Sequence, residues 1–241
     1  MPKPPKAYLS WSSGKDAAFA LHEVRRLGLA NVVGVLTTIN EASGRVQSHG
    51  VRQELLDRQI DALGLPAIKV MLPNPCPNAV YEARMEEAFG KLRSESVGHI
   101  VYGDLFLEDI RAYREKQLSG TGLEPLFPVW AIPTATLARQ MIASGIRAKL
   151  TCVDSAQIDP QFAGREFDAR LLSDLPSSAD PCGENGEFHT CVYAGPMFQQ
   201  PLALEPGEVV TREPFVWRDL QLVAEAAIGG QTRGLTPGLT P

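Results

Sequence analysis

The stretch SSGKD, residues 12–16, joins an apolar run to a helical pattern through small, cationic and acidic residues. Small residues let backbone N–H groups approach an anion, and the N-terminus of the following helix favours negative charge. Lys15 adds a positive charge, and Asp16 supplies a carboxylate that could help to hold Mg²⁺. Leu9 and Asp16 stand where a Walker A loop has Gly and Ser/Thr, which excludes that loop. The stretch predicts either another phosphate cradle or a plain helix start capped by Ser12 or Ser13.

A second polar cluster lies in GENGEFHT, residues 183–190. It places Glu184, Asn185, Glu187 and His189 within six positions. One interpretation is a carboxylate-and-imidazole group that closes over a ligand, in which Glu184, Glu187 or His189 takes up a proton. The other is an exposed, solvated turn. A metal site is the weaker alternative, because the ligands are few and mixed.

Two further polar groups follow expected strands. His49 and Arg52 come after the second strand, and the planar guanidinium of Arg52 suits a carboxylate or a phosphate. Asp104 follows the fourth strand and is the best candidate there for Mg²⁺ or a ribose. The alternative for Arg52 is a solvated position at a helix start.

The helix expected after Asp104 carries Asp109, Tyr113 and Arg114. Tyr113 and Arg114 are either substrate contacts or a charged face with an aromatic anchor. Asp109 is either a substrate contact or an ordinary first-turn residue, favoured there by the helix dipole.

The elements that position these residues alternate between strand and helix. The expected strands are Lys6–Trp11, Asn31–Thr38, Ala67–Leu72 and His99–Tyr102, and the expected helices are Asp16–Leu27, Val51–Leu63, Tyr81–Ser94 and Leu107–Leu118. This alternation predicts an α/β fold with a parallel sheet flanked by helices. Such sheets bind ligands beyond the carboxyl ends of their strands. We therefore expect the SSGKD turn, Thr37 and Gly103–Asp104 to converge at one edge.

The composition changes near residue 124, where Pro and aromatic residues become frequent. We expect a smaller C-terminal α+β domain, with helices at Thr136–Ser144 and Glu166–Leu172 and strands at Arg147–Val153, Cys191–Ala194 and Glu213–Leu222. The predicted division is residues 1–126, residues 127–223 and a disordered tail, residues 224–241.

Composition limits the class of protein. The 241 residues carry a net charge of −5 without a dense Lys/Arg patch, which disfavours a bulk electrostatic grip on nucleic acid. No apolar run approaches the ~20 residues of a membrane helix, and no signal peptide is visible, so we expect a cytoplasmic protein. The four cysteines form no CxxC pair; we expect unpaired thiols, with Cys182 as the candidate for reactivity.

These motifs, taken in order, resemble a known family. SSGKDA resembles the SGGKDS loop of the N-type ATP pyrophosphatases, the PP-loop superfamily. HGVR (49–52), GDLFLEDIRAYRE (103–115), PLFPVW (125–130) and GENGEFHT resemble the diphthine–ammonia ligase family, also described as adenine nucleotide alpha hydrolases. The resemblance covers about residues 6–222, and the loop together with GENGEFHT is its most specific part.

The resemblance implies an ATP-binding domain of the HUP type and a smaller closing domain. The implied nucleotide-binding residues are Ser12, Ser13, Gly14, Lys15, Asp16, Ala17, Thr37, Gly103 and Asp104, with Asp16 and Asp104 as Mg²⁺ ligands. The implied catalytic residues are Lys15, Asp16, Glu184, Glu187 and His189. The implied substrate contacts are His49, Arg52, Asp109, Tyr113, Arg114 and Asn185.

The implied activity is an ATP-dependent ligase reaction that forms an amide. A carboxylate is adenylated with release of pyrophosphate, and ammonia then displaces AMP. In archaeal and eukaryotic enzymes of the family the carboxylate is that of diphthine on elongation factor 2; a bacterial relative would need another acceptor. The oligomeric state stays open, with a homodimer as one alternative.

The loop departs from the family pattern at two positions. Ser13 stands where the family usually has Gly. If that position needs a positive φ, the serine there is strained by about 1 kcal/mol. Ala17 replaces a usual Ser, so a hydroxyl donor to phosphate is missing, a loss of roughly 1.5–3 kcal/mol. Two rival functions stay open: an ATP-driven RNA thiolase, which would need a sulfur carrier and a basic surface, and a nucleotide-binding regulatory module without turnover.

Overall fold

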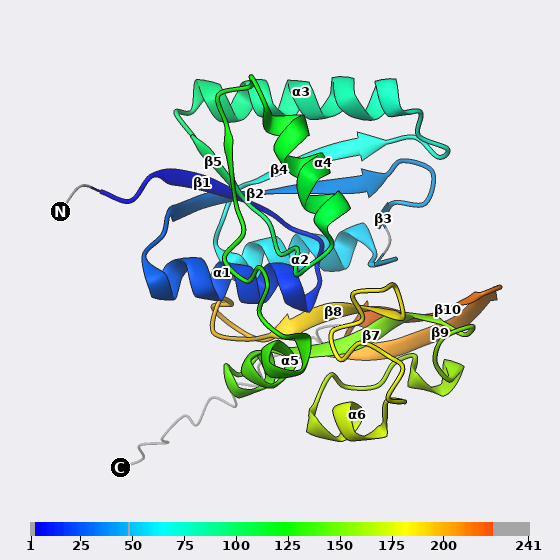
Figure 1. The fold of residues 1–241 in the computed structure, drawn as a ribbon. Coiled ribbons are helices and arrows are strands. Elements are labelled where there is room, and N and C mark those ends of the chain that lie inside the picture. The colour runs from blue at the N-terminus through cyan, green and yellow to red at the C-terminus, as the bar shows by residue number, and fades with distance from the viewer. Residues whose placement is uncertain (1–2, 48, 224–241) are drawn as a thin grey trace, which may run out of the picture.

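The computed structural model describes residues 3–47 and 49–223, which form two sheets with helices between and outside them (Figure 1). The first sheet consists of β1 (Lys6–Ser10), β2 (Asn31–Asn40), β3 (Arg45–Val46), β4 (Ala67–Leu72), β5 (His99–Val101) and β6 (Glu124–Leu126). β2 pairs with β4, β1 lies between β2 and β5, and β6 forms the far edge. All these pairings are parallel except that of β3, which lies antiparallel to the end of β2.

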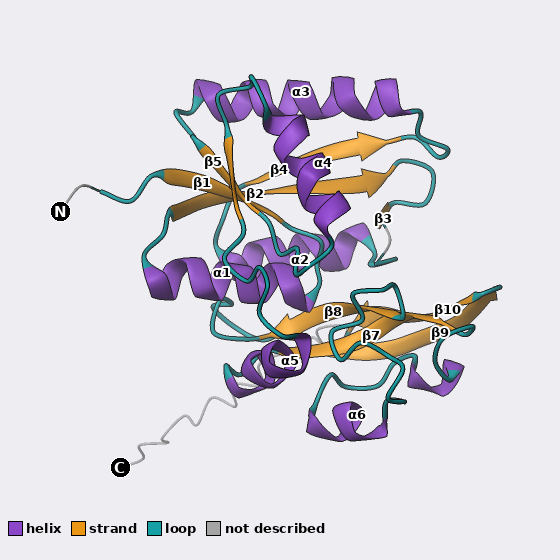
Figure 2. Cartoon of the chain, viewed as in Figure 1, coloured by secondary structure: helices purple, strands orange, loops and turns teal. Residues whose placement is uncertain are grey.

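Four helices accompany the first sheet: α1 (Lys15–Leu27), α2 (Gln53–Leu63), α3 (Asn78–Ser94) and α4 (Glu108–Leu118). Helices α1 and α2 cover one face of the sheet, and α3 covers the other (Figure 2). Gly28 and Gly64 end α1 and α2 in the left-handed conformation that C-caps favour. Helix α4 differs from the others because it buries only Leu118.

The second sheet is antiparallel, in the order β8 (Phe188–Ala194), β7 (Arg147–Asp154), β10 (Phe215–Leu222) and β9 (Leu204–Arg212). Helices α5 (Thr134–Ala143) and α6 (Ala169–Asp174) and the 3₁₀ turn η1 (Pro160–Phe162) belong to this part of the chain. The second sheet faces α1 and α2 from the side opposite the first sheet (Figure 1). One hydrophobic cluster accordingly joins α1 and α2 to β7, β8 and α5.

This architecture confirms the predicted fold class: a mainly parallel sheet flanked by helices, followed by a smaller α+β part. Strand β4 has the predicted bounds, and most other elements differ by one to three residues. The segment between β2 and α2, for which no strand was predicted, includes the two-residue strand β3. Two strands were not predicted from the sequence: β6, which is only three residues long, and the largely exposed β9.

Three expectations concern the domain division, the C-terminal tail and membrane helices. The division at residue 126 stays a prediction. The tail expected at 224–241 lies outside the described residues. Within residues 3–47 and 49–223, no helix combines the length and apolar character needed to cross a bilayer.

Candidate active site

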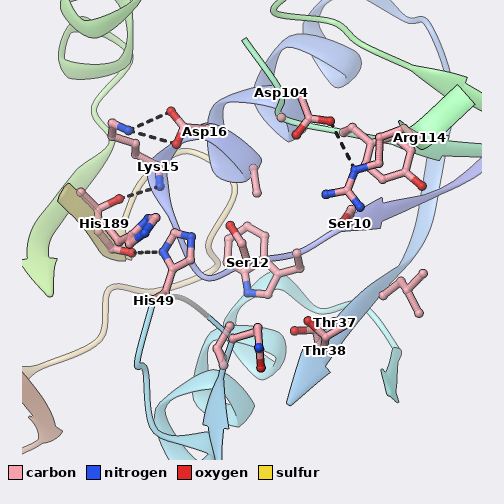
Figure 3. Close-up of a pocket in the computed structure, with 18 of the residues that line it drawn as sticks. Ser10, Ser12, Lys15, Asp16, Thr37, Thr38, His49, Asp104, Arg114 and His189 are labelled. Carbon is pink, nitrogen blue, oxygen red and sulfur yellow. Dashed lines mark hydrogen bonds and ion pairs between the residues drawn. The ribbon is translucent and has the colours of Figure 1, made fainter. Parts of the chain in front are cut away.

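A cavity of about 670 Å³ lies at the carboxyl ends of β1, β2 and β5. Its volume is within the range of roughly 300–1,000 Å³ typical of ligand sites. The first turn of α1 forms one wall, and the segment 182–190 of the second part closes over it. Residues from both parts of the chain therefore build a single site (Figure 3).

The predicted convergence of strand ends is found. Thr37 ends in the cavity with a buried hydroxyl that has no hydrogen-bond partner among the described residues. Gly103, after β5, packs so closely on α1 that an added Cβ would lie 2.8 Å from the Ala17 nitrogen. Only a glycine fits such an approach. Gly103 and Asp104 therefore reach the start of α1, beside Ala17.

Ser13 has a backbone φ of 72°. This is the left-handed conformation that was considered for this position because the family loop usually has Gly there. A serine in this conformation is strained. Its carbonyl accepts hydrogen bonds from Val192 of β8 at 2.9 Å and from Gln59 of α2 at 3.3 Å. Its hydroxyl is buried without a partner among the described residues. Ser13 therefore fastens the loop to the second sheet and does not line the cavity.

Lys15, the first residue of α1, is buried with its ammonium beside Asp16, at 2.9 Å and 3.0 Å from the two carboxylate oxygens. The ammonium also donates to the Cys182 carbonyl and lies 5.4 Å from the ring centres of Phe167 and Phe188. Burial alone would lower the pKa of Lys15, but the acidic groups around it, Asp16 first among them, together outweigh burial and the net pKa is raised. Lys15 is therefore a charged group held at a helix N-terminus.

His49 and His189 lie side by side, with ring centres 4.8 Å apart. His49 reaches the Thr190 carbonyl through Nδ1 at 2.8 Å and packs on Gly14, where an added Cβ would lie 2.5 Å from the ring. Desolvation and the charge of Lys15 lower the pKa of His49 to about 4. Desolvation, His49 and Lys15 lower that of His189 to about 3. Both imidazoles are neutral at pH 7.

Glu184 lines the same cavity and accepts a hydrogen bond from the Leu105 backbone N–H at 3.2 Å. Burial and the nearby charge of Asp16 raise the pKa of Glu184 to about 7. A carboxyl group that changes protonation near neutral pH is suited to general acid–base chemistry.

The opposite side of the cavity is formed by Asp104 and Arg114, whose Oδ2 and Nε atoms lie 3.5 Å apart (Figure 3). The Arg114 guanidinium stacks on Tyr102 at 4.9 Å. Burial and Asp16 raise the pKa of Asp104 against the opposing effect of Arg114. Tyr113 lies beside Arg114 at the cavity wall.

Glu187 lies behind the wall and organises the loop instead of facing the cavity. It is buried and accepts hydrogen bonds from the backbone N–H groups of Asp180 at 2.7 Å and Asn185 at 2.9 Å. Asp180 in turn accepts from the backbone of Cys182 and Glu184. Of the two glutamates in GENGEFHT, Glu184 is the one that the fold delivers to the cavity.

The structure brings most, but not all, of the sequence candidates together. Those that line the cavity are Ser12, Lys15, Asp16, Ala17, Thr37, His49, Gly103, Asp104, Tyr113, Arg114, Glu184 and His189. Those that do not are Ser13, Gly14, Arg52, Asp109, Asn185 and Glu187. Arg52 is ion-paired with Asp219 of β10, and Asp109 is exposed on α4.

Sequence reasoning missed several wall residues, among them Ser10, Tyr81, Met85, Tyr102 and Thr190. Two of them carried a usable signal, because Ser10 and Tyr102 stand at the expected carboxyl ends of strands. Cys182, the candidate for a reactive thiol, lies in a setting that disfavours reactivity. Its thiol is buried, and burial raises its pKa to about 12, so it is protonated at neutral pH.

Metal binding was expected at Asp16 and Asp104, and both line the cavity. In the described part of the chain, no group of three or more His, Cys, Asp or Glu side chains could hold a metal ion. Mg²⁺ commonly uses one or two carboxylates together with substrate phosphates, so two carboxylates fit that mode.

Comparison with known proteins identifies the family. The sequence profile of the diphthamide synthase N-terminal domain matches residues 5–125, and that of the C-terminal domain matches residues 133–219. The chain belongs to the diphthamide synthase family. Over 223 residues it is 23% identical to the diphthine–ammonia ligase of Bos taurus, covering 83% of each chain. Over 121 residues it is 29% identical to that of Homo sapiens, covering 48% of this chain and 45% of that protein.

Proposed function

We propose that this diphthamide synthase family member is an ATP-dependent ligase that adenylates a carboxylate and then forms an amide with ammonia. The observation that carries the proposal is the buried, charged Lys15 at the N-terminus of α1, enclosed by the segment that delivers Glu184. A helix N-terminus with a lysine suits a polyphosphate, and an ionisable carboxyl group beside it suits proton transfer.

ATP is proposed to bind with its phosphates at the start of α1. Ser12, Lys15, Asp16 and Ala17 line this end, and the backbone of Ser13 and Gly14 shapes the turn. Thr37, whose hydroxyl has no partner among the described residues, and Gly103 are proposed to contact the rest of the nucleotide. Asp16 and Asp104 would hold Mg²⁺, which would offset phosphate charge.

In the first step, a carboxylate oxygen of the acceptor attacks the α-phosphorus of ATP and the bond to the β-phosphate oxygen breaks, releasing pyrophosphate. Lys15 and the α1 N-terminus stabilise the negative charge that gathers on the leaving group. Arg114 holds the incoming carboxylate, with Tyr113 beside it.

In the second step, ammonia attacks the acyl carbon and the bond to AMP breaks. The attacking nitrogen must lose a proton, and Glu184 is proposed to accept it because its pKa is about 7. The neutral His49 and His189 are positioned to orient groups at the phosphate end. Glu187 and Asn185 support this arrangement by fixing the loop.

The names of the relatives support diphthine as acceptor and ammonia as nitrogen donor. If the source lacks diphthine, the same chemistry would serve another carboxylate. Cytoplasmic location and homodimer formation stay predictions.

The proposal is tested by product analysis with purified protein, Mg·ATP, ammonium and a diphthine-bearing acceptor. We expect AMP and pyrophosphate from the wild type, and at least a hundredfold lower rate in Lys15→Ala, which removes the charge at the phosphates. Asp174→Asn, at an exposed ion pair with Arg165, is the matched control and should retain the rate. ADP and phosphate as products would contradict the proposal. ATP binding without turnover would support the regulatory module.

A further inference from the structure

A buried aspartate links the second sheet to a loop of the first part. Asp219 of β10 accepts hydrogen bonds from Arg45 Nη1 at 2.8 Å and from Arg52 Nε at 2.8 Å. The Asp219 side chain is 8% exposed, whereas its arginine partners extend partly into solvent. Burial alone would raise the pKa of Asp219, but the hydrogen bonds from Arg52 and Arg45 outweigh it and the net pKa is lowered. Asp219 is therefore a carboxylate at neutral pH.

The two arginines stand at the two ends of one short loop, residues 45–47 and 49–52, called here the His49 loop. Arg45 and Arg52 lie opposite each other as an isolated antiparallel bridge. The Val46 N–H donates to the Val51 carbonyl at 2.8 Å, and Arg45 also donates to the Gly50 carbonyl at 2.6 Å. Because Asp219 binds both ends, it closes the loop as well as anchoring it.

The loop carries one side chain deep into the site. His49 packs on Gly14, reaches the Thr190 carbonyl at 2.8 Å and lies beside His189. Gly14 belongs to the first part of the chain, and Thr190 and His189 belong to the second. The position of His49 thus depends on how the His49 loop sits against the second sheet, and Asp219 is the charged contact that sets it.

We propose that Asp219 is a positioning residue, which acts through Arg45 and Arg52 to hold His49 in the phosphate end of the cavity. The effect of Asp219 on catalysis rests on the proposed function, whereas its effect on the position of His49 does not. It also assigns Arg52 a role in place of the substrate contact expected from the sequence.

The test is a histidine NMR titration of the full-length protein, with His49 assigned by the signal lost in His49→Gln. Lys15 is the charged side chain that lowers the pKa of His49, and the titratable His189 lies beside it. In the wild type His49 should titrate near pH 4. In Asp219→Asn we expect its midpoint to rise by at least one pH unit, because a released ring regains water.

The direction of the shift separates positioning from simple charge removal. Loss of a negative charge favours the neutral imidazole and would lower the midpoint or leave it unchanged, whereas release of the loop raises it. Asp174→Asn, which removes an equally charged residue from an exposed pair, should leave the midpoint unchanged. An unchanged or lowered His49 midpoint in folded Asp219→Asn would overturn the proposal.

A second variant guards against a folding defect. Arg52→Gln breaks the same contact from its half-exposed end, and should also raise the midpoint by at least one pH unit. Lys15, and not Arg52, is the cation whose charge lowers the pKa of His49, so a rise in this variant also reports release of the loop. If both variants fold and neither moves the midpoint, Asp219 does not position His49.

Activity gives a separate reading. We expect kcat for AMP formation to fall at least tenfold in Asp219→Asn with the KM for ATP within twofold. If the wild type forms no AMP, the proposed function fails, while the titration still decides whether Asp219 positions His49.

Discussion

At the scale of single residues, the loop at the start of α1 has a serine at a position whose left-handed backbone conformation favours glycine. Ser13 has a φ of 72°, and its buried hydroxyl has no partner among the described residues. The sequence could flag this position because a glycine is usual there in the resembling loop. The sequence could not show that the Ser13 carbonyl is fastened to β8, because that contact spans the two parts of the chain.

Ser13→Gly should stabilise the protein. Relief of the left-handed conformation and of the buried hydroxyl outweighs the greater freedom that glycine gives the unfolded chain, for a net gain of about 1 kcal/mol in the free energy of unfolding. Urea denaturation measures it. Ser12→Gly is the control and should gain nothing, because Ser12 has no positive φ. A Ser13→Gly protein less stable than wild type would show that this strain is absent.

Glu184 should govern how activity depends on pH. Its carboxyl group loses a proton near pH 7, so AMP formation by the wild type should rise through pH 7 as the base is freed. Glu184→Gln should be slower by about 10²–10⁴-fold and should lose that rise. The rates are to be measured at a constant concentration of free ammonia, with Asp174→Asn as the control. A rise that persists in Glu184→Gln would assign the titration to another group.

At the scale of elements, the site depends on a buried hydrogen-bonded residue that joins α2, the segment between β1 and α1, and β8. Gln59 is fully buried, accepts from the Trp11 indole N–H at 3.2 Å and donates to the Val192 carbonyl at 2.6 Å. These partners lie far apart in the sequence, so no local pattern could mark Gln59, Asp180 or Asp219 as important. Helical periodicity does place Gln59 within α2, but it cannot say that this residue faces two other elements.

Gln59→Leu should destabilise the protein without changing the fold. The substitution leaves the Trp11 N–H and the Val192 carbonyl buried without partners, which together cost about 2–4 kcal/mol. Thermal or urea unfolding measures this loss. Gln140→Leu, on the exposed side of α5, should change stability by no more than about 0.5 kcal/mol. Equal effects of the two substitutions would contradict the role given to Gln59.

Much of the element pattern was predictable. Apolar runs and helical periods located β1, β2, β4 and β5 and the helices α1 to α4, because each is continuous and ends at Gly, Pro or polar residues. β6 was not predictable, since three residues that include Pro125 carry no strand pattern and gain their place only by pairing with β5. The same limit applies to GENGEFHT. Its polar residues indicated a site, but only the fold shows that Glu184 lines the cavity and that Glu187 does not.

At the scale of the whole molecule, the cavity exists because two sheets share one layer of helices. Helices α1 and α2 lie between the sheets and contribute to a hydrophobic cluster that continues into β7 and β8 (Figure 1). The second part therefore acts as a wall of the site. Its loop covers Lys15, and its β10 anchors the His49 loop through Asp219.

The most direct test of the proposed chemistry is exchange of labelled pyrophosphate into ATP. Wild-type protein, Mg·ATP and the carboxylate acceptor are incubated with labelled pyrophosphate in the absence of ammonium. Reversible adenylation predicts label in ATP that requires the acceptor, does not require ammonium and is lost in Lys15→Ala. AMP formation with ammonium but no exchange without it would contradict an adenylated intermediate.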